Sequence, residues 1–274
     1  MARLTPLLIK SFLLLALVVL MPSDVLAQVG EHRNELSVGV NGGYVMSNVG
    51  YVNKIPQSLH KGLTGGLSFR YTSEKYFNSI CAVVAEVNFA QIGWKENILD
   101  ENDEPVINAE TELAEEYQRD MTYIQIPVFA RLGWGRERRG LQAFFQVGPQ
   151  IGFFKSEKSM ANFDYSHWSH YNLVDRVSVV SSDYVDQQGR QIGSNVYNMP
   201  VENKVDYGIA GALGIEFSQP KLGHFLLEGR YYYGLGDIYG NSKRDYFSRS
   251  NFSNIIVKLS YFFDITKTKN PKIR

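Results

Sequence analysis

The stretch VDYGIAGALGIEF (205–217) alternates large apolar side chains with small or charged ones along most of its length. Its large residues are Val205, Tyr207, Ile209, Leu213, Ile215 and Phe217, and between them lie Asp206, Gly208, Ala210, Ala212, Gly214 and Glu216. A period of two is typical of a β-strand with one apolar face. The stretch therefore predicts a strand, and it leaves open whether the apolar face meets a protein core or lipid.

Seven further stretches repeat this alternation. They are ELSVGVNGGYV (35–45), KGLTGGLSFRYT (61–72), CAVVAEVNFA (81–90), TYIQIPVFARL (122–132), LQAFFQVGPQIGFF (141–154), FLLEGRYYYGL (225–235) and SNIIVKLSYFF (253–263). Each reaches the ~9–11 residues that a tilted strand needs to cross a bilayer. Eight such strands fit a transmembrane barrel, but alternation alone fits a soluble β-sandwich equally well.

The connections between these stretches distinguish the two folds. Long connections alternate with short ones: the long ones are 46–60, 91–121, 155–204 and 236–252, and the short ones are 73–80, 133–140 and 218–224. An up-and-down barrel in an outer membrane has short periplasmic turns and long outer loops, which gives this rhythm. Loops as long as the second and third would be unusual inside a compact soluble domain. The spacing therefore favours the barrel.

The face opposite the apolar one carries charges of both signs. These residues are Arg70, Glu86, Arg131, Asp206, Glu216, Glu228, Arg230 and Lys258. In a small barrel this face points inward, where charges must pair because an unpaired buried charge costs several kcal/mol. We therefore predict an all-β fold, an eight-stranded antiparallel up-and-down transmembrane β-barrel with long extracellular loops and short periplasmic turns. The eight charged residues form its predicted interior network, and outer-membrane lipid surrounds its apolar face.

The two ends of the chain predict segments outside the barrel. Arg3 and Lys10 precede the apolar run SFLLLALVVLM (11–21), and small residues end at Ala27, so residues 1–27 are expected to be a cleaved signal peptide. A membrane anchor is the alternative, but the run is shorter than the ~20 residues of a spanning helix. Residues 28–264 then form the outer-membrane barrel domain. Residues 265–274 form a basic periplasmic tail, which either contacts anionic partners or is a solvated end.

Composition excludes several classes of protein. The chain has 28 basic and 28 acidic residues, which argues against a general nucleic-acid-binding protein. Its only cysteine is Cys81, so it has no internal disulfide and is not a small disulfide-stabilised secreted domain. Tyrosine (17) and phenylalanine (16) dominate the aromatic residues, as in strands with interfacial aromatics.

The ordered series of blocks resembles a known family. KGLTGGLSFRY, AEVNFAQIGW, YIQIPVFARL, VGPQIGFF, VDYGIAGALGIEF, LEGRYYYGLGDIYG and NIIVKLSYFF are similar to successive blocks of the PorT-type outer-membrane β-barrel proteins of Bacteroidetes, over nearly all of residues 35–264. The resemblance implies an eight-stranded outer-membrane barrel, and some members of that family are required for type IX protein secretion. The chain departs from a common barrel ending, because the tail DITKTKNPKIR follows Phe263.

Two predicted outer loops carry the other candidate sites. Residues 95–120 are strongly acidic, and Asp100, Glu101, Asp103 and Glu104 offer oxygen ligands for a hard cation, although the spacing is not that of an EF-hand. Residues 155–203 contain SHWSHYN, in which His167 and His170 have a spacing that a transition-metal site could use. We expect no metal and no cofactor. A solvated acidic loop and a Tyr-, Ser- and Asn-rich contact loop are the favoured interpretations.

The histidines give little support for catalysis. His32 and His224 lie at the predicted periplasmic side, and His60 at the outer rim is expected to reach Asp237 or Asp245 only if the loops fold inward. We therefore expect no enzyme activity. Two functions remain. The first is an accessory or scaffold of an envelope process such as type IX secretion, with secretion-system or other envelope proteins as partners. The second is a surface-binding or envelope-stabilising barrel whose loops (95–120 and 155–203) contact protein or glycan.

Overall fold

A computed structural model of the chain shows an all-β protein. It describes residues 31–51, 56–76, 78–100, 102–108, 111–136, 139–162, 170–172, 177–179, 201–239 and 250–266. The expected signal peptide and the tail from residue 267 onward lie outside these residues. Among the described residues, no helix is long and apolar enough to span a membrane.

Eight long strands account for most of the described chain. They are β1 (Glu31–Tyr51), β3 (His60–Tyr76), β4 (Ser79–Asn97), β5 (Glu116–Gly135), β6 (Gly140–Ala161), β9 (Val205–Gln219), β10 (Gly223–Gly234) and β11 (Ser250–Asp264). Three short strands are added to these: β2 (Gln57–Ser58), which pairs with β4, and β7 (His170–Asn172) and β8 (Val177–Val179), which pair with each other.

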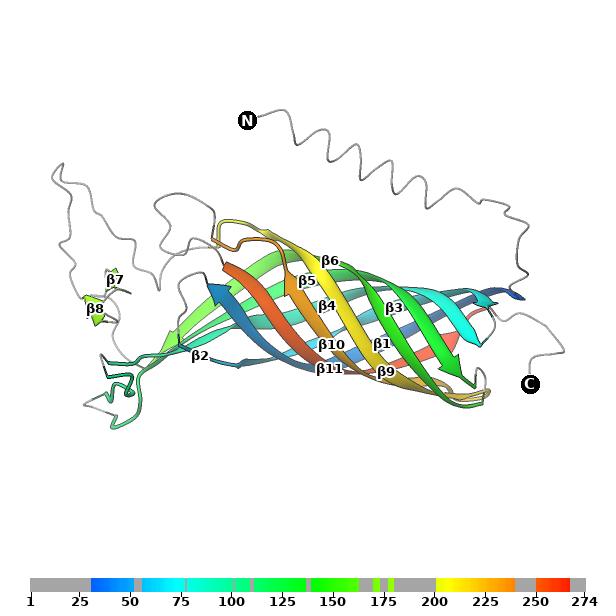
Figure 1. Ribbon diagram of the computed structural model, residues 1–274, viewed down its shortest axis with the longest axis horizontal. Helices are drawn as coiled ribbons and strands as arrows, with labels where there is room; N and C mark the ends of the chain where they lie inside the picture. The colour runs from blue at the N-terminus through cyan, green and yellow to red at the C-terminus, as the bar shows by residue number, and fades with distance from the viewer. Residues whose placement is uncertain are drawn as a thin grey trace, which may run out of the picture. The chain divides into compact units, whose positions relative to one another are not determined.

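The eight long strands form one closed ring (Figure 1). Their spatial order is β4-β3-β1-β11-β10-β9-β6-β5, and β5 pairs back with β4. The first and last strands are antiparallel neighbours over a long register, from Ser37 opposite Asp264 to Tyr51 opposite Ser250. The predicted eight-stranded antiparallel up-and-down barrel is therefore confirmed.

Short and long connections lie at opposite ends of the barrel. At one end, here called the turn end, short turns join β3 to β4, β5 to β6 and β9 to β10, and β1 begins and β11 ends there (Figure 1). At the other end, the loop end, the long connections follow β4, β6 and β10. The predicted alternation of short and long connections is thus present in the fold.

The predicted borders of two loops are wrong. Strand β4 continues to Asn97 and β5 begins at Glu116, so the acidic loop covers 98–115 instead of 95–120. Strand β6 continues to Ala161, so the next loop begins at 162 instead of 155. The reason is that ladder pairing continues where the alternation has stopped: Lys95 faces Gln118, and Gln118 faces Met160.

Strand β11 ends at Asp264, and the two residues after it remain hydrogen-bonded to the barrel. The backbone N–H groups of Ile265 and Thr266 donate to the carbonyl oxygen of Leu36 at 2.7 and 3.2 Å. The Thr266 hydroxyl in turn accepts a hydrogen bond from the backbone N–H of Leu36 at 2.8 Å. These bonds tie residues 265–266 to β1, so the described end of the chain still belongs to the barrel.

Side chains on the two faces of the sheet meet different surroundings. The outward face carries large apolar residues, of which Leu213 is 65 %, Leu259 64 % and Leu63 63 % exposed. The inward face carries buried polar and charged residues from every long strand. A soluble sandwich would have the opposite arrangement, because it buries its apolar face. The surface of this barrel is therefore suited to lipid.

Inward-facing glycines let neighbouring strands approach closely. A Cβ atom on Gly148 would lie 1.9 Å from the carbonyl oxygen of Val128 on β5, and one on Gly66 would lie 2.0 Å from that of Val87 on β4. Real Cβ atoms do not come this close to backbone oxygen, so a side chain at either position would push the strands apart. A ring of only eight strands has strong curvature, and glycine is the residue that permits it.

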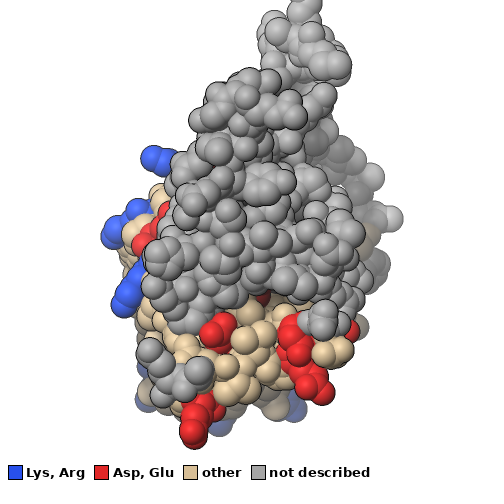
Figure 2. Space-filling view, turned by 90° about the vertical axis from the view of Figure 1, so that its left-hand side faces the viewer, with Lys and Arg blue, Asp and Glu red and all other residues tan. Residues whose placement is uncertain are grey.

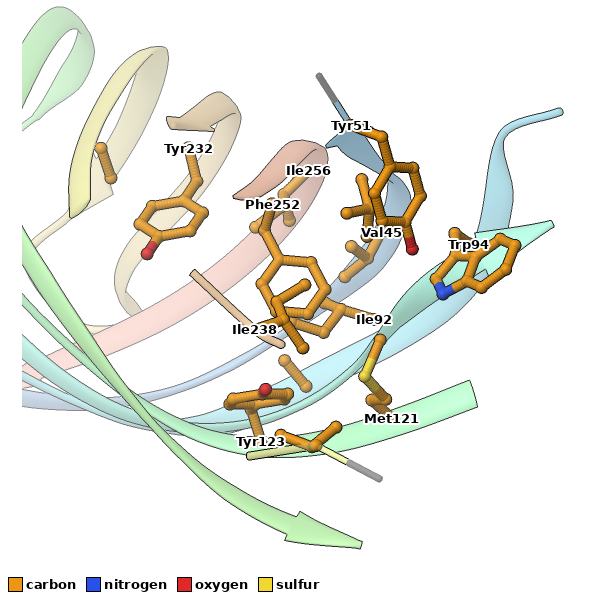
Figure 3. Close-up of a cluster of buried hydrophobic side chains, with 14 of the residues drawn as sticks. Val45, Tyr51, Ile92, Trp94, Met121, Tyr123, Tyr232, Ile238, Phe252 and Ile256 are labelled. Carbon is orange, nitrogen blue, oxygen red and sulfur yellow. The ribbon is translucent and has the colours of Figure 1, made fainter. Parts of the chain in front are cut away.

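A cluster of buried apolar side chains fills the interior near the loop end (Figure 3). Tyr123 packs edge-on against Phe252, with ring centroids 5.4 Å apart, and Trp94 packs against Tyr51 at 5.6 Å. Ile238 and Tyr239 from the connection after β10 join the cluster. We refer to these residues as the aromatic cluster.

We predict that Gly148→Val destabilises the barrel. The added side chain would clash with the β5 backbone, and overpacking of this kind costs about 1–3 kcal/mol. The urea midpoint of unfolding should fall, as read from the fraction that migrates as the compact form on unboiled SDS gels. Gly42→Val is the matched control, because a Cβ there meets nothing nearer than 3.9 Å. Equal midpoints for the two variants would contradict the prediction.

Candidate functional site: the charged barrel interior

The structure buries all eight predicted interior residues. Arg70 is the most exposed of them at 6 %, and Lys258 the least at 1 %. They come from six of the eight long strands, namely β3, β4, β5, β9, β10 and β11. Which of them touch one another depends on strand register and depth, and they divide into two clusters and one separate residue.

The central cluster joins two acids and two bases. Lys258 Nζ lies 2.6 and 2.7 Å from the carboxylate oxygens of Glu86, and Arg230 Nη2 donates to Glu86 at 2.9 Å. Arg230 also donates to Glu228 at 2.6 Å, and Lys258 Nζ lies 3.1 Å from Glu228. Gln146 completes the set by donating to Glu228 at 2.9 Å. The four charges sum to zero, so each buried ion has an opposite partner.

A second cluster lies nearer the turn end and centres on Glu216. Arg70 Nη1 lies 2.9 Å from both carboxylate oxygens of Glu216, and Arg131 also contacts Glu216. His224 Nδ1 lies 2.7 Å from Glu216, and its Nε2 lies 3.0 Å from Asp264. Asp264 supplies a second acid to this cluster, 3.8 Å from Arg70.

Sequence reasoning missed His224 and Asp264 as interior partners. The register of β10 and β11 pairs His224 with Phe262, which puts it two residues from Asp264 across the ladder. The available signal was their position: both lie at a strand end, in phase with the inward face. Inward-facing positions were assigned only within the alternating stretches 225–235 and 253–263, and His224 and Asp264 lie just outside them.

Asp206 lies apart from both clusters. Its Oδ2 accepts a hydrogen bond from the Tyr232 hydroxyl at 2.6 Å. In the described ranges Asp206 joins none of the ion pairs, although the sequence grouped it with the interior network. The reason is depth in the barrel, because Asp206 begins β9 near the loop end whereas Glu216 lies near the turn end of the same strand.

The geometry of the two clusters favours bracing over transport or catalysis. Three arginines also stack on aromatic rings: Arg131 lies 3.8 Å from the centroid of Phe144, Arg230 4.6 Å from Phe129 and Arg70 5.0 Å from Phe262. Charge-assisted hydrogen bonds and cation–π contacts therefore tie opposite walls of the barrel together.

For His60, the sequence named Asp237 and Asp245 only as partners that loops folding inward could bring within reach, and Asp245 lies outside the described residues. His60 Nε2 instead lies 2.6 Å from Asp120 Oδ1. The reason is Gly93 on the intervening strand β4, which faces Asp120 and leaves room for His60 to reach across; a Cβ there would lie 3.3 Å from the His60 ring. Asp237 instead accepts the backbone N–H of Ser250 at 3.0 Å.

Ser47, His60 and Asp120 form a chain that resembles a hydrolase triad. Ser47 Oγ lies 3.3 Å from His60 Nδ1. However, Ser47 is fully buried, and its hydroxyl donates to the Gly93 carbonyl at 3.0 Å and accepts from the Gly93 N–H at 2.9 Å. A nucleophile must reach its substrate with a free lone pair. This serine is held against the backbone, which favours a structural role.

The acidic loop is organised by its own hydrogen bonds. Asp100 Oδ1 accepts the backbone N–H groups of Asn102 at 2.8 Å and Glu104 at 2.9 Å. Both bonds lower the pKa of Asp100, and the bond from Glu104 has the larger effect. In the part of the chain that the structure describes, no three His, Cys, Asp or Glu side chains are grouped as metal ligands. His167 and the side chain of His170 lie outside that part.

Comparison with known proteins identifies a family model and several similar structures. The model described as "Outer membrane protein beta-barrel domain" matches residues 26–240. Among curated proteins, none matches the chain. Similar solved structures include Ail of Yersinia pestis in complex with the heparin analogue sucrose octasulfate (13% identity, 84% of this chain and 99% of that chain, TM-score 0.35).

Two further structures are similar at the same level. OprG of Pseudomonas aeruginosa is 11% identical over 86% of this chain and 99% of that chain, with a TM-score of 0.37. Neisserial surface protein A is 9% identical over 83% of this chain and 97% of that chain, with a TM-score of 0.38. Because all three TM-scores are below 0.5, the fold is established by the strand pairing and the family model instead.

We predict that Glu86→Gln lowers the free energy of unfolding by about 3–5 kcal/mol, the usual cost of removing one partner from a buried ion pair. The neutral amide would leave Lys258 and Arg230 sharing Glu228 alone. Urea unfolding of the folded protein in detergent micelles measures the change. Glu104→Gln is the control, because Glu104 is an exposed residue of the acidic loop. Equal stabilities would show that Glu86 does not hold the two cations.

Proposed function

The chain belongs to the family of outer membrane protein β-barrel domains, and we propose that it is a non-enzymatic barrel that contacts another macromolecule, a protein or a glycan, on the outer side of the membrane. The observation that carries the proposal is the unequal length of the strands. Three neighbouring strands, β4, β5 and β6, continue past the loop end of the barrel and form a projecting sheet (Figure 1).

The projecting sheet is defined by the strand registers. Strand β6 pairs with β9 only as far as Phe153 opposite Val205, but with β5 as far as Ala161 opposite Tyr117. Residues 154–161 therefore extend roughly 25 Å beyond the last pair with β9, at ~3.3 Å per residue. Strand β4 accompanies them, with Asn97 opposite Glu116. Regular sheet outside the membrane is a firm support for contact residues.

The described residues of the loop between β4 and β5, namely 98–100, 102–108 and 111–115, continue this sheet as an arm. The N–H of Val106 donates to Ile98 O at 3.0 Å, and the N–H of Glu115 donates to Val106 O at 2.7 Å. The arm exposes two large apolar side chains, Ile107 at 58 % and Leu113 at 62 %. Acidic side chains lie on the described part of this end of the molecule (Figure 2). Apolar residues ringed by polar ones are typical of a protein contact site.

The absence of enzyme activity is part of the proposal. Ser47, the candidate nucleophile of the only Ser–His–Asp chain near the loop end in the described residues, is fully buried. The carboxylates of the two interior clusters are engaged by cations of the protein itself. A contact function needs neither a free nucleophile nor a free acid, and it agrees with both observations.

Site-specific photocrosslinking on intact cells tests the contact. With benzoylphenylalanine in place of Ile107, we expect a discrete adduct to a protein, or, for a glycan partner, loss of glycan-array binding in the Ile107→Ser/Leu113→Ser double variant. The same crosslinker at the outward-facing, mid-strand residue Leu259 is the control and should not give that protein adduct. No protein adduct from Ile107, together with unchanged glycan binding, would contradict the proposal.

A second candidate function is an accessory or scaffold role in type IX protein secretion. It is supported by the ordered blocks from KGLTGGLSFRY to NIIVKLSYFF, which resemble the PorT-type proteins of Bacteroidetes. In this role the projecting sheet, or the basic segment after Thr266, would contact other components of the secretion machinery.

Comparison of surface and secreted proteomes between the parent strain and a clean deletion tests the secretion role. Proteins with type IX sorting domains should accumulate in the periplasm of the deletion strain and return to the surface when the gene is restored. Restoration with the Ile107→Ser/Leu113→Ser variant shows whether the arm is the surface used. An unchanged set of exported proteins would remove the secretion role and leave the surface-contact function.

A further inference from the structure

The lipid-facing rows of β9 and β10 are each interrupted by one glycine. On β9 the outward residues are Val205, Tyr207, Ile209, Gly211, Leu213, Ile215 and Phe217, and on β10 they are Phe225, Leu227, Gly229, Tyr231 and Tyr233. The strand register places Gly211 opposite Tyr231 and Gly229 opposite Leu213. The two glycines are therefore diagonal neighbours, and large side chains surround them.

These two glycines form the floor of a groove on the outer surface of the barrel. The groove has a volume of about 340 Å³, and its walls are Phe145 from β6, Leu213 from β9, Tyr231 from β10 and Ile255 from β11. Four adjacent strands thus contribute to it. The surrounding wall side chains are apolar or aromatic, and Arg230 borders it while its own charged group points into the barrel, where it is 3 % exposed.

Packing does not require glycine at these positions. A Cβ on Gly229 would meet nothing within 4 Å, and one on Gly211 would only reach the carbonyl oxygen of Gln146 at 3.9 Å. This differs from the inward-facing Gly148 and Gly66, where a Cβ would collide with the next strand. Glycine inside a strand weakens it and often marks a place where another molecule comes close. The open space itself is therefore the feature that these glycines provide.

The depth of the groove decides what can occupy it. Gly211 and Gly229 each lie near the middle of a strand that crosses the membrane, with outward apolar residues above and below them. At this depth a ligand must be apolar, since the hydrocarbon region offers no water and the walls present no charged group. A flexible hydrocarbon chain can follow the diagonal between two glycines. A protein partner would need a far larger complementary surface than one groove.

We propose that the groove between β9 and β10 binds one acyl chain of a membrane lipid and holds it more firmly than the lipid around the rest of the barrel. The chain lies over Gly211 and Gly229, and the aromatic rings of Phe145 and Tyr231 flank it. Its polar headgroup extends toward a membrane surface and is not recognised by the groove. The site is selective for a hydrocarbon chain and indifferent to headgroup.

Photolabelling in nanodiscs tests this binding. The probe is phosphatidylcholine with a diazirine in the middle of one acyl chain, used with the full barrel, and adducts are mapped by mass spectrometry. In the wild type, labelling should concentrate on the peptides that carry β9 and β10. Gly229→Leu places a side chain in the groove, at a position where a Cβ meets nothing within 4 Å. It should lower labelling of these peptides about tenfold while other strands are unchanged.

Two controls make the result decisive. Ala130→Leu adds bulk to the lipid-facing side of β5 outside the groove, so labelling of β9 and β10 should stay at the wild-type level. Unboiled SDS gels must show that both variants remain folded; if Gly229→Leu does not fold, Gly211→Ala replaces it, with a smaller loss in the same direction. Even labelling around the wild-type barrel would overturn the proposal. So would protection of the groove in native outer membranes but not in nanodiscs, since another protein would then occupy it.

Discussion

Backbone hydrogen bonding between the first and last strands, β1 and β11, is the interaction on which the rest of the structure depends. It converts a sheet with two open edges into a ring, from Ser37 opposite Asp264 to Tyr51 opposite Ser250. In a bilayer no water is available for unpaired N–H and C=O groups, so a spanning sheet must close. Closure with only eight strands also fixes a narrow interior, and this narrowness limits which side chains can point inward.

The interior meets that limit with small residues and paired charges. Glycines such as Gly148 allow the wall to curve, and Glu86, Glu228, Arg230 and Lys258 fill the middle as a neutral set. Each charge has lost water and is stabilised only by its partners, so the cluster ties three strands, β4, β10 and β11, to one geometry. The aromatic cluster packs in the interior near the loop end. The interior therefore supports the wall, and interactions with other molecules are left to the outer surfaces.

The outer surface meets two solvents, water beyond the membrane and lipid within it. In each solvent one feature departs from the regular pattern of the barrel. In water, β5 and β6 continue beyond the last pair of β6 with β9, and the arm that follows β4 exposes Ile107 and Leu113. In lipid, Gly211 and Gly229 break two rows of large side chains and leave a groove. A bare barrel of minimal length needs neither feature, because its stability comes from closure and from the interior. This is why the two features support proposals about binding, whereas the interior network supports an account of stability.

The sequence by itself determined the strands, their two faces and the rhythm of the connections. These properties are local, since side chains alternate with a period of two along any strand, and turn and loop lengths can be counted directly. Only the tertiary structure decided which charges meet: Glu216 binds Arg70, Arg131 and His224, whereas Asp206 bonds to Tyr232, and His60 reaches Asp120 across Gly93. Which interior side chains meet across the barrel depends on the register of several successive strand pairs and on the depth of each residue in the barrel. The same long-range pairing carries β4, β5 and β6 past the point where their alternation ends, because a ladder continues as long as a neighbour is present to pair with it.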